Sequence, residues 1–147
     1  MATERTARAT WSGSLLESSG DVSATSSGLF ADAPVTWASR TESAQGRTSP
    51  EELLAAAHAA CFAMALSHSL AGAGASPERL EVIATATFDR TDAGFRVTGV
   101  ALDVTGRVPG VDAGAFEDAA REAGDDCPIS NALKGNVPIT VTAALAR

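Results

Sequence analysis

The residues best suited to chemistry in this sequence are its two cysteines, Cys61 and Cys127. The thiolate form of cysteine is a nucleophile and a metal ligand, so the pair is compatible with redox catalysis or metal binding. A structural disulfide is less expected in a reducing cytoplasm. Cys61 taken alone is better explained as packing, because a free cysteine often behaves as a small buried hydrophobe.

Cys127 lies in the segment GDDCPIS, directly before Pro128. Proline disfavours helical conformation in the preceding residue and suits the first position of a helix. This pattern predicts Cys127 as a helix N-cap, with backbone N–H groups near its sulfur that lower its pKa. Asp125 and Asp126 oppose that shift, since nearby negative charge disfavours a thiolate. The signals conflict, and we interpret Cys127 as accessible but not strongly activated.

Cys61 needs a nearby cation if it is to react, because burial alone raises the pKa of a thiol. The candidates are His58, one helical turn before it, and Arg40 and Arg47 in the segment upstream. Glu51, nearly three turns before Cys61, could hold an arginine through a bidentate pair. A simpler role for Glu51 is to complement the positive end of the helix dipole.

A zinc site is a weaker alternative. His58 and Cys61 share a helix face, and His68 and Cys127 would complete four ligands. The sequence has no Cys-x-x-Cys pair, and His68 lies two turns beyond Cys61. We therefore interpret both histidines as hydrogen-bonded core or surface residues.

The element that positions Cys61 is a predicted helix, SPEELLAAAHAACFAMALSHSL, over Ser49–Leu70. Ser49 suits the N-cap, Pro50 the first helical position, and Glu52 completes a capping box. Apolar residues nearly surround this helix, which is typical of a buried helix.

Strands and shorter helices are expected around it. The first 30 residues, rich in Ser, Thr and Gly, predict short antiparallel strands with a turn near Ser18–Asp21. The other expected elements are a strand over 33–39, a hairpin of strands 80–88 and 95–104, a helix over 112–124 after Asp112, a helical turn after Cys127, and a strand over 137–145. This order predicts an α+β protein with a single domain over residues 1–147.

Composition excludes some functions. The chain has 147 residues and a net charge of −7, from 11 basic and 18 acidic residues. This charge argues against a nucleic-acid partner and against binding to anionic membranes. The N-terminus lacks the apolar stretch of a secretory signal, and the Ala-rich run at 53–66 is too short to span a bilayer. A cytoplasmic location is expected.

Two segments carry a family resemblance. TSPEELLAAAHAACFAMALS resembles the peroxidatic helix of the osmotically inducible protein C and organic hydroperoxide resistance family of thiol peroxidases, and CPISNAL resembles its second-cysteine motif. The start of the chain, from ATWSGS to WASRT, is similar to the osmotically inducible subgroup. In that subgroup the active-site arginine comes from the segment before the helix, where this chain has Arg40.

The resemblance implies the fold of that family: antiparallel sheets around a long buried central helix, in an intertwined homodimer with its sites at the interface. It implies a peroxidatic Cys61, a resolving Cys127, and Arg40 held by Glu51. It further implies an organic hydroperoxide substrate and an external dithiol reductant such as a lipoylated protein. No metal, flavin or nucleotide is expected as a cofactor.

Apolar residues around Cys61 predict a pocket for the tail of an alkyl hydroperoxide. The expected lining residues are Ala57, Ala60, Phe62, Met64 and Ala65, with Phe30, Trp37 and Phe116 available from other elements. Two alternatives remain open: a non-catalytic cysteine redox sensor, and a stress-related binding protein whose cysteines are structural.

Overall fold

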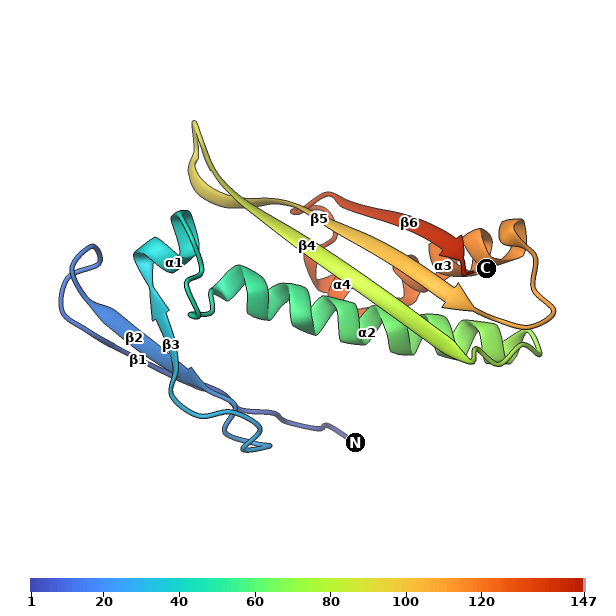
Figure 1. Ribbon diagram of the computed structural model, residues 1–147, viewed down its shortest axis with the longest axis horizontal. Helices are drawn as coiled ribbons and strands as arrows, with labels where there is room; N and C mark the ends of the chain where they lie inside the picture. The colour runs from blue at the N-terminus through green and yellow to red at the C-terminus, as the bar shows by residue number, and fades with distance from the viewer. Residues whose placement is uncertain (147) are drawn as a thin grey trace. The chain divides into compact units, whose positions relative to one another are not determined.

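The computed structural model describes residues 1–146 and shows an α+β chain that divides into two compact units (Figure 1). One unit comprises Met1–Leu53, and the other begins at Leu54. The α+β class predicted from the order of elements is confirmed.

The N-terminal unit contains a three-stranded antiparallel sheet in the order β1-β2-β3. Its strands are β1 (Arg8–Ser12), β2 (Ser19–Ser23) and β3 (Ala33–Thr36). The predicted turn near Ser18–Asp21 was wrong, because Asp21 lies within β2 opposite Thr10. The connection comes earlier, after β1, where Gly13 takes a φ of 89° that side chains rarely tolerate.

The strand predicted over 33–39 ends at Thr36, where a short helix, α1 (Trp37–Thr41), begins. Thr36 and Ser39 form a capping box: each side-chain oxygen accepts a hydrogen bond from the other residue's backbone N–H at 3.0 Å. This reciprocal cap explains why the chain turns helical there. It also places Arg40 in the last turn of α1.

The long helix α2 (Pro50–Gly72) begins as predicted, with the Ser49 hydroxyl accepting a hydrogen bond from the Glu52 N–H at 3.2 Å. Its buried positions form one stripe, and they are Glu51, His58, Phe62, Leu66 and Leu70. Met64, on another side of the helix, is 68% exposed. A single chain therefore covers only part of this apolar helix. By length and composition alone α2 could cross a membrane, a test that core helices of soluble proteins also pass.

The second unit contains the hairpin of β4 (Arg79–Thr91) and β5 (Gly94–Arg107), joined at its edge by β6 (Ile139–Leu145). The strands β4 and β5 are antiparallel, as expected, and pair along their whole length to a tight turn after Thr91. The expectation of purely antiparallel sheets fails at β6, which runs parallel to β5. Two helices lie between these strands in the chain, and such a crossover allows parallel pairing.

Those helices are α3 (Ala113–Asp126) and α4 (Pro128–Leu133). Asp112 caps α3 as predicted, since its carboxylate accepts a hydrogen bond from the Ala115 N–H at 2.9 Å. The helix continues past Gly124, the predicted stop, to Asp126. Its buried face joins the core of this unit, whose largest members are Phe62, Leu66, Leu70, Leu102 and Phe116.

Candidate functional site

The two thiols that the sequence separates by 66 residues are neighbours in the second unit, where each one shifts the pKa of the other. Cys61 lies in the middle of α2 and is half-buried, whereas Cys127 is fully buried; both are free. Cys127 joins α3 to α4. Its N–H donates to the Ala123 carbonyl at 2.9 Å, and its carbonyl accepts from the Asn131 N–H at 2.9 Å. The backbone of Cys127 is therefore fixed from both sides.

Cys127 is the N-cap of α4, with Pro128 at the first helical position, as predicted. Burial raises the pKa of its thiol, but hydrogen-bonding contacts from the Ser130 N–H and hydroxyl, the Cys61 thiol and the Ile129 N–H outweigh burial and lower the pKa. These groups influence the thiolate electrostatically, since the Cys127 side chain makes no capping hydrogen bond. The expectation that Cys127 is accessible was wrong, because its side chain is fully buried.

The pKa of Cys61 is shifted upwards. Burial is the main cause, the Ile129 N–H opposes it, and contact with Cys127 adds to it. Because burial raises the pKa of Cys61 in the folded chain, the thiol needs a nearby cation before it can react, as the sequence predicted.

Cys61 borders a groove of about 620 Å³ in the second unit. Its apolar lining consists of Ala57, Ala60, Met64, Ala65, Pro128 and Ile129, and its polar lining of His68, Ser69 and Asp126. Two predicted lining residues, Phe62 and Phe116, are instead fully buried in the core. Phe62 follows Cys61 by one residue, which rotates it about 100° around α2 and onto the buried stripe. Phe30 and Trp37 belong to the N-terminal unit, and their place in a pocket stays a prediction.

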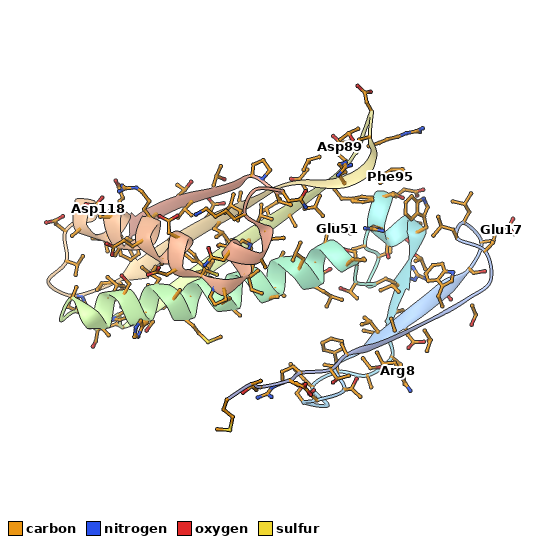
Figure 2. All side chains as sticks on the ribbon, turned by 180° about the vertical axis from the view of Figure 1, so that it is seen from behind. Arg8, Glu17, Glu51, Asp89, Phe95 and Asp118 are labelled. Atoms are coloured by element: carbon orange, nitrogen blue, oxygen red, sulfur yellow. The ribbon has the colours of Figure 1, made fainter. Side chains whose placement is uncertain are left out.

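The N-terminal unit contains the ion pair predicted between Arg40 and Glu51. Arg40 Nε lies 3.0 and 3.1 Å from the two Glu51 oxygens, and Nη2 lies 2.7 Å from Oε1. The guanidinium carbon also lies 5.8 Å from the centre of the Trp37 ring. Glu51 is buried at the first turn of α2, where Figure 2 labels it. Arg47, the other candidate, is exposed in the connection from α1 to α2.

Sequence reasoning left the role of His58 open and did not single out Ser130. His58 is fully buried, and its Nε2 lies 2.8 Å from the Ser130 hydroxyl. Burial lowers the pKa of His58, which keeps the ring neutral. Ser130 could have been found from the motif CPIS, because it follows the N-cap cysteine by three residues, where N-cap side chains meet backbone N–H groups. The zinc set is not assembled: across residues 1–146, no three His, Cys, Asp or Glu side chains converge.

Two neighbouring free thiols define a redox-thiol protein of the α+β class: Cys61 lies on a long apolar helix beside an apolar groove, and Cys127 lies at a helix start. The family model described as "OsmC-like protein" matches residues 42–142, and the chain belongs to this family. The family resemblance seen in the two cysteine segments is thereby confirmed.

Relatives and solved structures agree with this assignment. The chain is 40% identical to Peroxiredoxin OsmC of Escherichia coli (strain K12) over 139 residues, which are 95% of this chain and 96% of that protein. It is 36% identical to organic hydroperoxide resistance protein OhrA of Bacillus subtilis (strain 168), covering 71% and 73% of the two chains. A crystal structure of an organic hydroperoxide resistance protein from Elizabethkingia anophelis superposes with a TM-score of 0.77 at 28% identity, over 99% of this chain and 100% of that one.

Proposed function

We propose that this protein is a thiol peroxidase that reduces organic hydroperoxides to alcohols through a cycle of its two cysteines. The proximity of two free thiols, each of which shifts the pKa of the other, carries the proposal, because a peroxidase of this type must join the two sulfurs as a disulfide. The names of its relatives, a peroxiredoxin and organic hydroperoxide resistance proteins, support the same reaction and an antioxidant role in stress.

In the first step, the Cys61 thiolate attacks the terminal oxygen of the hydroperoxide. A sulfur–oxygen bond forms and the peroxide O–O bond breaks, so sulfur is oxidised to a sulfenic acid and the substrate is reduced to an alcohol. The apolar groove beside Cys61 would bind the organic tail of the substrate. This arrangement favours organic hydroperoxides over hydrogen peroxide.

Arg40 is the cation proposed to favour the Cys61 thiolate and the charge on the departing oxygen, with Glu51 orienting it. Ten helical residues separate Glu51 from Cys61, a rise of about 15 Å along α2. In an intertwined homodimer, the ion pair of one chain would serve the thiols of the other. The uncovered apolar side of α2 supports such an assembly, because an exposed patch of this kind usually marks an interface.

In the second step, Cys127 attacks the Cys61 sulfenic acid and water leaves as the disulfide forms. An external dithiol then reduces the disulfide by thiol–disulfide exchange. A lipoylated protein or a small dithiol fits this role, since either can open the disulfide and close its own. A reducing cytoplasm would keep such a donor reduced, which is why we propose that location.

The test is to mix the protein with cumene hydroperoxide and excess dithiol and to follow peroxide loss. A peroxidase consumes many equivalents of peroxide for each protein chain. A non-catalytic redox sensor would be oxidised once without rapid dithiol-driven turnover. A binding protein with structural cysteines would show no thiol oxidation in its folded state, so either of these outcomes would refute the proposal.

A further inference from the structure

His58 is a fully buried histidine to which the peroxidase cycle gives no role. Its Nε2 contacts the Ser130 hydroxyl at 2.8 Å, whereas its Nδ1 is buried with no hydrogen-bond partner within the described residues. An unpaired buried polar atom destabilises a fold, so such an atom in a native structure calls for an explanation.

The unpaired Nδ1 indicates the tautomer of His58. A buried N–H without an acceptor is rarer in proteins than an under-used acceptor. We therefore assign the proton of the neutral ring to Nε2, which then donates to the Ser130 oxygen. With its oxygen accepting from His58, the Ser130 hydroxyl is free to direct its own proton at a second acceptor.

The second acceptor is the Cys127 sulfur. Ser130 is the third residue after Cys127, the N-cap of α4, and its hydroxyl and N–H both stabilise the Cys127 thiolate. The hydrogen bond from His58 to Ser130 is thus linked to Cys127 through the stabilising effect of Ser130 on its thiolate, and Cys127 in turn influences the pKa of Cys61.

We propose that His58 is a positioning residue for disulfide formation, which holds the Ser130 hydroxyl as a hydrogen-bond donor to the Cys127 thiolate. This inference rests on the proposed peroxidase function and concerns its second step. The Cys127 thiolate attacks the Cys61 sulfur, an S–S bond forms, and the S–O bond of the sulfenic acid breaks. The leaving hydroxide takes up the proton that Cys127 lost on ionising, so the product is water.

Loss of the Ser130 donor makes the Cys127 thiolate scarcer. One pKa unit corresponds to a tenfold change in thiolate population. A thiolate of higher pKa is also a better nucleophile, which recovers part of the rate. For a rise of about one unit, disulfide formation should slow about three- to fourfold. The first step should be no slower, because a protonated Cys127 no longer repels charge on Cys61.

The experiment oxidises reduced protein with one equivalent of cumene hydroperoxide and quenches it at intervals for mass spectrometry. The Cys61 sulfenic acid, trapped by dimedone, reports the first step, and the disulfide reports the second. The variants are Ser130→Ala, His58→Leu, the double variant, and His58→Gln, which keeps an N–H donor. Asn131→Ala, exposed on the same helix as Ser130, and Leu66→Ala, a packing loss on the same helix as His58, are the controls.

The proposal expects slower disulfide formation in both single variants, no further slowing in the double variant, and recovery in His58→Gln. Three results would overturn it. The slowing of disulfide formation in the double variant could equal the product of the two single effects, disulfide formation could be unchanged in the single variants, or both steps could slow equally, as expected for Leu66→Ala. If His58→Leu fails to fold, Ser130→Ala and His58→Gln still decide the outcome. Wild-type protein that forms no sulfenic acid would refute the peroxidase function itself, a result distinct from unchanged kinetics in the variants.

Discussion

The Arg40 guanidinium binds the Glu51 carboxylate through two nitrogens, with Nη2 2.7 Å from Oε1 and Nε at 3.0 and 3.1 Å from the two oxygens. The carboxylate is buried, and the arginine side chain is 30% exposed. Two nitrogens in one plane fix the direction of the positive charge, which a lysine at this position would not do.

The Arg40→Ala variant should slow oxidation of Cys61 by at least tenfold, about 1.4 kcal/mol, because the thiolate loses its proposed cation and the transition state loses charge stabilisation. Arg40→Lys should slow Cys61 oxidation by a similar factor. The oxidation rate of Glu51→Gln should lie between the rates of these variants and that of wild type. Stopped-flow oxidation by cumene hydroperoxide measures the rate. Arg47→Ala is the matched control. If Arg47→Ala slowed Cys61 oxidation strongly and Arg40→Ala slowed it only slightly, Arg47 rather than Arg40 would be the activating cation.

Substitution of each cysteine should separate the two steps. Cys61→Ser should abolish peroxide consumption, because the nucleophile is lost. Cys127→Ser should react once and accumulate a Cys61 sulfenic acid that dimedone traps, since no thiol remains to resolve it. The lowered pKa of Cys127 makes the reversed assignment a real alternative. A single-turnover reaction in Cys61→Ser, with none in Cys127→Ser, would establish that reversal.

Substrate preference should follow the apolar groove. Second-order rates with Cys61 should rise from hydrogen peroxide to tert-butyl and cumene hydroperoxide, because each buried CH₂ contributes about 0.8 kcal/mol. Ala60→Gln should reduce this preference by narrowing and polarising the groove, whereas Ala56→Gln, an exposed position on the same helix outside the groove lining, should not. Equal rates across the series in wild-type protein would mean that the groove does not bind substrate.

Assembly follows from the uncovered side of α2. We expect a homodimer with about twice the chain mass of 14.9 kDa, because the apolar side of a 23-residue helix that one chain leaves open is best covered by a second copy. Sedimentation velocity at low micromolar concentration measures the mass. A monodisperse monomer would contradict the expectation.

Folding stability should depend on pH through His58. Its pKa lies below 6.5 in the folded state because of burial, so below pH 6.5 the unfolded chain binds a proton that the folded chain excludes. Stability should therefore fall as pH drops through this window, by up to about 1.4 kcal/mol per pH unit.

Urea unfolding of reduced protein between pH 7.5 and 5.5, at fixed protein concentration, measures this dependence. His58→Gln should lose that part of the pH slope, and His68→Gln, which replaces an exposed histidine, should keep it. An unchanged slope in His58→Gln would show that another group is responsible.

The sequence by itself determined the elements and the family. Local signals were strong where capping and periodicity agreed: Ser49 and Pro50 at the start of α2, Asp112 before α3, and the alternating strand that became β4. The family could be recognised from the two cysteine motifs, because the residues of each motif are adjacent in the chain. The strand predicted through Ser39 failed because a reciprocal cap between Thr36 and Ser39 started a helix.

Only the tertiary structure decided which groups meet. Three such relationships join residues distant in sequence: the parallel pairing of β6 with β5, the proximity of Cys127 to Cys61, and the contact of His58 with Ser130. Which side of α2 the second unit covers was also undecided, because a helix that is apolar all round has no periodic signal to choose a face. That choice put Phe62 in the core and Cys61 at the groove. Burial and contacts then set the opposed pKa shifts of the two thiols, which no local pattern encodes.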